Sequence, residues 1–130
     1  MIAAPVSGIS RPVQAELLQR ARQVARSDGD AHPYGIRAVR TTRLRSIRLQ
    51  PGTTAPTCEQ SASCADAPVY VIAMRGRFSC GACPGPPGSR APRGTVITLV
   101  LEGPRLFDSV FALQGRYPKL ARAGTVVHLH

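Results

Sequence analysis

The sequence of 130 residues contains no asparagine, no tryptophan and a single lysine, Lys119, and only 5% of its residues are aromatic. A core built from this sequence must therefore consist mainly of aliphatic side chains and alanine. The other 16 of its 17 basic residues are arginines, and seven acidic residues leave a net charge of +10. Because the avoidance of Lys and Asn indicates GC-rich coding as much as selection for guanidinium groups, arginine count alone does not assign a function. The charge nevertheless attracts polyanions such as nucleic acid, anionic lipid or a cell-wall polymer.

Long hydrophobic runs are also missing. The longest lies between Val96 and Leu101 and is interrupted by Thr98, which predicts no membrane span. Residues 1–8 have neither a basic stretch nor an apolar core of sufficient length, so they do not form a signal peptide as written. We expect a cytoplasmic protein as written, or an exported one if an export signal lies upstream of Met1.

Recognisable catalytic patterns are absent too. The seven carboxylates are scattered over turns, one helix face and loops, with no pairing suited to acid–base chemistry. The sequence has no nucleophile elbow, no glycine-rich phosphate loop followed by a helix and no H-E-x-x-H motif. It therefore predicts a protein that is not an enzyme and needs no cofactor.

The residues that are present predict one α+β domain over residues 10–130, preceded by a disordered tail over residues 1–9. Apolar residues recur at helical spacing from Val13 to Val24, with Ser10 as N-cap and Asp28 and Gly29 at the end, which predicts a helix over residues 11–27. Strongly β-forming runs follow at residues 69–78, 95–101, 106–113 and 125–129, separated by irregular loops at 50–68 and 79–94. We expect the N-terminal helix to pack on a mainly antiparallel, meander-type sheet of about four strands, in two layers.

Residues 36–49 are rich in both β-branched residues and arginine. Alternation fails between Thr41 and Leu44, which predicts a strand with a bulge or break, with a second helix as the lesser alternative. This segment is a candidate for contacts with a phosphate backbone, although the shortage of aromatic residues for base stacking favours a solvated basic face. The basic patch consists of Arg37, Arg40, Arg43, Arg45 and Arg48.

The strand at residues 69–78 and the strand that follows it have two apolar faces. If the helix covers the face that carries Ile72 and Met74, valines remain on the opposite face. That face is either covered by the long loop and the C-terminal segment, which is the favoured reading, or it is an interaction surface that would also serve a homodimer. The candidate surface residues are Val69, Val71, Ala73, Val96 and Val100.

Four cysteines, Cys58, Cys64, Cys80 and Cys83, flank the strand at residues 69–78 in two pairs. A ten-residue strand is about 33 Å long, so a four-cysteine zinc site requires one loop to fold back along it. The C-x-x-C at Cys80 lacks the following helix that stabilises a redox thiolate, because prolines and glycines come next. Disulfides in an oxidising compartment are therefore favoured, with free thiols, zinc and redox activity as alternatives.

His128 and His130 lie two residues apart near the C-terminus. On a strand they would project from one side, a spacing that suits a metal pair. A frayed, charged terminus is the favoured interpretation.

The segments at residues 69–78, 86–88 and 92–100 resemble a pattern found in small exported bacterial proteins with a PepSY-like or cystatin-like α+β module. In that pattern a strand leads to a second strand and an acidic turn, to which the segment from Leu101 to Asp108 is similar. The resemblance covers about half of the chain and carries over no catalytic residue. It implies export, a helix on an antiparallel sheet, and a binding or inhibitory role.

Composition, the missing catalytic groups and this resemblance together predict an exported, non-catalytic binding or inhibitor-like module that acts through its sheet face or loops. Its expected partner is a protein or an anionic cell-surface polymer. The alternatives are a cytoplasmic zinc or thiol-redox regulator built on the cysteines, and a basic nucleic-acid-binding protein.

Overall fold

The computed structural model describes residues 8–49, 66–79, 88, 90, 93–102, 107–114 and 116–130, and of residues 107–114 it describes the backbone path alone. It confirms the α+β class. The strands β1 (Tyr34–Thr42), β2 (Pro68–Ser79), β3 (Arg93–Glu102), β4 (Phe107–Gln114) and β5 (Val126–His128) form one sheet in the order β4-β3-β2-β1-β5. Every neighbouring pair is antiparallel, so β1 to β4 form a meander and β5 returns to pair with β1.

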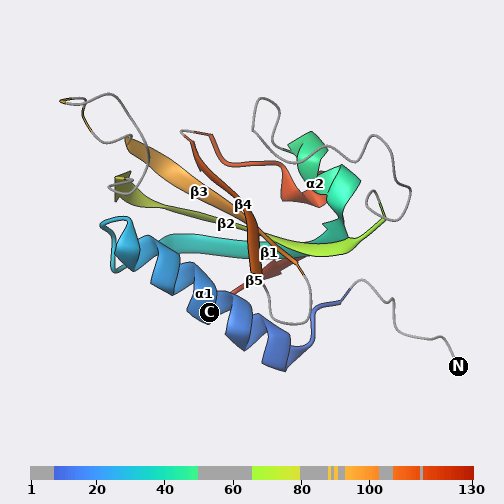
Figure 1. Ribbon diagram of the computed structural model, residues 1–130. Helices are drawn as coiled ribbons and strands as arrows, with labels where there is room; N and C mark the ends of the chain where they lie inside the picture. The colour runs from blue at the N-terminus through green and yellow to red at the C-terminus, as the bar shows by residue number, and fades with distance from the viewer. Residues whose placement is uncertain are drawn as a thin grey trace, which may run out of the picture.

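The helix α1 (Arg11–Ser27) has the bounds that the sequence predicts and lies along one face of the sheet (Figure 1). Its end follows from local chemistry, because Gly29 adopts a φ of 94° that other residues rarely tolerate. The Gly29 backbone N–H donates to Arg26 and that of Asp30 donates to Ala25. These two bonds form a Schellman motif that satisfies the last carbonyl groups of the helix.

Apolar side chains of α1 bury against the sheet. Leu17, Ala21 and Ala25 are fully buried and pack in a cluster with Ile72 and Met74 of β2. Ile9 belongs to the same cluster and is 6% exposed. Ile9, the last residue of the predicted tail, therefore contributes an apolar side chain to this core.

The opposite face of the sheet is covered as well. The five candidate surface residues are each at most 2% exposed, so their side chains are covered within the folded chain itself. Leu49, Tyr117, Leu120, Ala123 and Val126 pack in the cluster on this side. The C-terminal segment therefore covers this face, which is one half of the favoured sequence prediction. Most of the long loop, which was the other half of that prediction, lies outside the described residues. The residues concerned are Val69, Val71, Ala73, Val96 and Val100.

The predicted strand over residues 36–49 is wrong in its second half. β1 ends at Thr42 and a short helix, α2 (Arg43–Leu49), follows it on the side of the sheet away from α1 (Figure 1). The Thr42 hydroxyl accepts a hydrogen bond of 3.3 Å from the backbone N–H of Arg45, which is the geometry of a helix N-cap. The failed alternation after Thr41 therefore marked a change from strand to helix.

The turn after α1 is fastened to the end of β2. Asp30 accepts hydrogen bonds of 2.8 Å from the backbone N–H groups of His32 and Arg77, one on each carboxylate oxygen. The backbone N–H of Ser79 donates to the Asp28 carbonyl at 2.8 Å. These contacts fix the helix end against the sheet and hold the pKa of Asp30 below its usual value, because both backbone donors favour the charged carboxylate.

Candidate functional site

A cavity of about 550 Å³ lies where β1, β5 and the 3₁₀ helix η1 (Leu120–Arg122) meet. We call it the C-terminal basic cavity. Leu120 and Val126 belong to the apolar cluster beneath it, whereas the charged lining residues are exposed. None of the described lining residues is acidic. They are Arg37, Tyr117, Pro118, Lys119, Leu120, Ala121, Arg122, Val126 and His128.

Strand register brings two of these residues together. Arg37 of β1 and His128 of β5 are direct partners across the antiparallel pair. Directly opposed residues project from the same face of a sheet and have Cβ atoms roughly 5 Å apart. Their side chains therefore line one wall of the cavity, and η1 supplies Arg122 on the other side.

Tyr117 connects the cavity to the sheet. Its hydroxyl lies 2.8 Å from the Gly35 carbonyl oxygen and 3.1 Å from that of Ala73, and its proton is shared between these two acceptors. Burial raises the pKa of Tyr117 to about 12, although the Arg37 and Arg75 charges act to lower it. The phenol therefore stays protonated at neutral pH and remains a donor.

The ring of Tyr117 organises two guanidinium groups. The Cζ atom of Arg75 lies 4.4 Å from the ring centroid and that of Arg37 lies 5.7 Å away, distances typical of cation–π contacts. Stacking engages the flat face of a guanidinium, whereas its N–H donors lie in the plane of the group. A guanidinium held in such a contact can still donate its N–H groups to the oxygen atoms of an anion.

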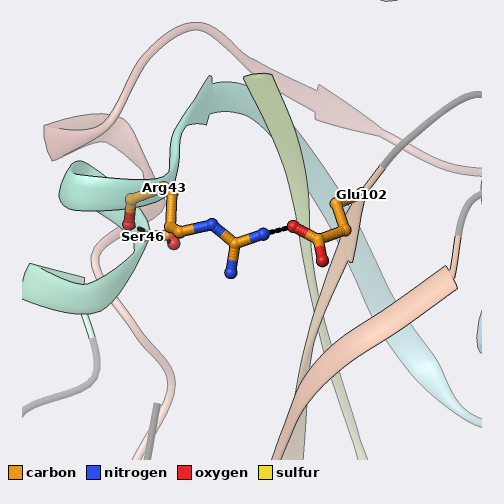
Figure 2. Close-up of polar contacts among 3 residues, drawn as sticks. All are labelled: Arg43, Ser46 and Glu102. Carbon is orange, nitrogen blue, oxygen red and sulfur yellow. Dashed lines mark hydrogen bonds and ion pairs between the residues drawn. The ribbon is translucent and has the colours of Figure 1, made fainter. Parts of the chain in front are cut away.

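The five arginines of the predicted basic patch are divided among different surroundings. Figure 2 shows the Arg43 guanidinium directed from α2 to the Glu102 carboxylate at the end of β3, with which it forms an ion pair. The Ser46 hydroxyl donates to the Arg43 carbonyl at 2.6 Å. Of the five, only Arg37 lines the cavity. The five arginines do not follow one strand, because the chain changes from strand to helix at Arg43, and their role as a phosphate-binding patch stays a prediction.

The other predicted site residues are the four cysteines and the two C-terminal histidines. Cys58, Cys64, Cys80 and Cys83 all fall outside the described residues, so the disulfide, zinc and redox interpretations stay predictions. His128 lines the cavity but His130 is exposed at the C-terminus. Within the described part of the chain, no three metal-ligating side chains gather at one point.

Sequence reasoning missed Tyr117, Lys119 and Arg122, because residues 115–124 read as an irregular basic segment. The available signal was an aromatic residue among cations, Arg116-Tyr117-Pro118-Lys119. The contacts of Tyr117 join residues 82 and 44 positions apart. Such long-range contacts are not visible in a local pattern.

Comparison with known proteins finds no family model that matches the chain, no similar curated protein and no similar solved structure. Among the described helices, none combines the length and apolar character that crossing a membrane requires. Functional inference for this chain therefore depends on the geometry and charge of its own residues.

Proposed function

We propose that this protein is a non-catalytic binding module whose ligand is anionic, and that the C-terminal basic cavity is the binding site. The observation that carries the proposal is the gathering of Arg37, Lys119 and Arg122 around one cavity whose described lining contains no carboxylate. Its volume of about 550 Å³ lies within the range of pockets that hold small ligands or a segment of a polymer.

Preorganisation supports the same conclusion. Long arginine side chains lose conformational entropy when they are held by a ligand, which weakens binding. Cation–π contact with the ring of Tyr117 restricts Arg37 and Arg75 before any ligand arrives. The hydroxyl bonds of Tyr117 to two strands in turn restrict the ring, so part of this entropic cost is met in the unliganded fold.

The proposal moves the expected binding surface from the sheet face to the cavity, because the valine face is buried. Export, which the PepSY-like or cystatin-like resemblance implies, and an anionic cell-surface polymer as partner stay predictions from the sequence, and the proposed anion site does not depend on them. The arrangement favours ligand binding over a cysteine-based regulator, because the described cations form a site that needs no contribution from the cysteines.

The test distinguishes binding at the cavity from general attraction by the net charge of the protein. Inorganic polyphosphate is titrated into wild-type protein and into the double variant Arg37→Gln/Arg122→Gln by isothermal calorimetry at low salt. The matched control is Arg22→Gln/Arg26→Gln, which removes the same charge from exposed positions on α1. At about 1 kcal/mol for each cation near an anionic surface, the cavity variant should bind roughly 10- to 30-fold more weakly.

The control variant should bind within about twofold of wild type, because its arginines lie on the solvent side of α1. Equal losses in the two double variants would show that net charge alone attracts the polymer, and would refute the cavity as the site. Absence of polyphosphate binding by the wild-type protein at low salt would refute the proposed function itself.

A further inference from the structure

We infer that the anionic ligand is single-stranded nucleic acid, with its phosphates over the C-terminal basic cavity and a base stacked on Tyr34. This inference rests on the proposed function and specifies its ligand. The observation behind it is an exposed aromatic ring at one end of the same run of cations. Tyr34 is 64% exposed, more than the only other large hydrophobic side chain exposed among the described residues, Leu44 at 38%.

The backbone around Tyr34 presents its side chain away from the core. The pairing of β1 with β2 is irregular between Tyr34 and Arg37, and Gly35 within this bulge has a φ of 59°. A bulge of this kind changes the direction in which the neighbouring side chain points. The bulge therefore allows an aromatic residue at the start of a strand to remain outside both apolar clusters.

Strand register places Tyr34 beside the residues that lead to the cavity. Its direct partner on β2 is Arg75, and the guanidinium of Arg75 lies over the ring of Tyr117. The same ring carries Arg37, which lines the cavity. Along β1, Tyr34 and Arg37 are about 10 Å apart at the usual rise per residue. An extended strand of a few nucleotides is long enough to contact both.

The combination of cations and an accessible ring distinguishes a single strand from other anions. Polymers without aromatic groups would use the cations and leave Tyr34 without a role. A duplex keeps its bases stacked within the helix, where Tyr34 cannot reach a base face. Unpaired bases have exposed π-faces, and stacking on aromatic side chains together with a positive groove is the common mode of single-strand binding.

The test measures binding of a labelled oligo(dT) of about ten nucleotides by fluorescence anisotropy, and binding of inorganic polyphosphate as an anion without bases. Tyr34→Ala should weaken oligo(dT) binding by about 5- to 150-fold, the range for loss of one stacked base, and leave polyphosphate binding within about twofold. Tyr34→Phe keeps the ring and should retain wild-type binding of the oligonucleotide. Leu44→Ala, which truncates an exposed apolar side chain on α2, is the matched control and should bind as wild type.

The outcomes distinguish this inference from the proposal on which it rests. If Tyr34→Ala binds oligo(dT) as wild type does, or if a duplex or polyglutamate binds as tightly as oligo(dT), the single-strand inference is overturned. The anion site would then still stand if polyphosphate binding depends on Arg37 and Arg122. If neither polymer binds wild-type protein at low salt, both the inference and the proposed function are overturned. Thermal unfolding of each variant confirms that it is folded.

Discussion

Replacing Asp30 by alanine should loosen the end of α1 from β2. The variant loses two carboxylate acceptors that receive backbone N–H groups at 2.8 Å from His32 and Arg77. Hydrogen bonds to buried charged groups contribute about 1.5–3 kcal/mol each, but solvent screens this partly exposed carboxylate, which reduces the figure to about 1 kcal/mol each. We expect the free energy of unfolding to fall by about 2 kcal/mol, which is roughly 7 °C in melting temperature for a domain of this size.

The pH dependence provides a sharper test of the same contacts. The pKa of Asp30 is lowered from its ordinary value of 3.8, chiefly by the backbone N–H of Arg77 and then by that of His32. A carboxyl with a lowered folded-state pKa stabilises the fold above its unfolded-state pKa and loses that contribution as the pH falls below it. The stability difference between wild type and Asp30→Asn should therefore be constant from pH 7 to about pH 5 and shrink below 3.8.

Urea denaturation followed by circular dichroism at pH 7, 5 and 3 measures this difference. Asp28→Asn is the matched control two residues away, because burial raises the pKa of Asp28 and its charge is disfavoured in the folded state. That variant should be as stable as wild type or slightly more stable at pH 7, with its difference also fading at low pH. An Asp30→Asn variant that matches wild type at pH 7, or a difference that persists undiminished at pH 3, would refute the reasoning.

Three further substitutions test other parts of the structure, each by urea denaturation at pH 7. Tyr117→Phe should lower the free energy of unfolding by about 1–2 kcal/mol, because the carbonyls of Gly35 and Ala73 lose their shared donor, and polyphosphate binding measured by calorimetry should weaken slightly, because the ring remains but the hydroxyl bonds that restrict it are lost. Thr98→Val should stabilise the protein by about 1 kcal/mol, since its fully buried hydroxyl lacks a hydrogen-bond partner among the described residues; a loss of stability would contradict this. Val71→Ala should destabilise by about 2–3 kcal/mol if the valine face is buried, whereas an exposed face predicts almost no change.

Elements governed by local chemistry were predictable from the sequence. Helix α1 has the predicted bounds because Pro12 suits its first turn and Gly29 supplies the left-handed residue that ends it. The strong β-forming runs correspond to β2 and β3, each extended by one or two residues at its ends. In these segments intrinsic propensity and tertiary packing favour the same structure.

Elements that depend on distant partners were not predictable in the same way. Residues 43–49 carry β-branched and arginine side chains, yet they form α2, which is capped by Thr42 and joined to β3 through the Arg43–Glu102 ion pair. The cavity requires Tyr117 to reach two strands that are remote in sequence. A seven-residue helix and a long-range side-chain contact leave little trace in local periodicity.

The net charge of the whole protein and the cations at the cavity should contribute differently to the salt dependence of binding affinity. A net charge of +10 attracts any polyanion from a distance, and this general attraction is screened beyond about 10 Å in 0.1 M salt. Direct contacts instead release counterions, with a logarithmic slope of about −0.7 for each phosphate bound on a single strand. Since Arg37, Lys119 and Arg122 provide three cations at the cavity, their contribution to the slope is about −2. On the described strands both apolar faces are buried, so the proposed recognition site is this end of the molecule, where Arg37 and the exposed ring of Tyr34 lie on β1 and Arg122 lies in η1.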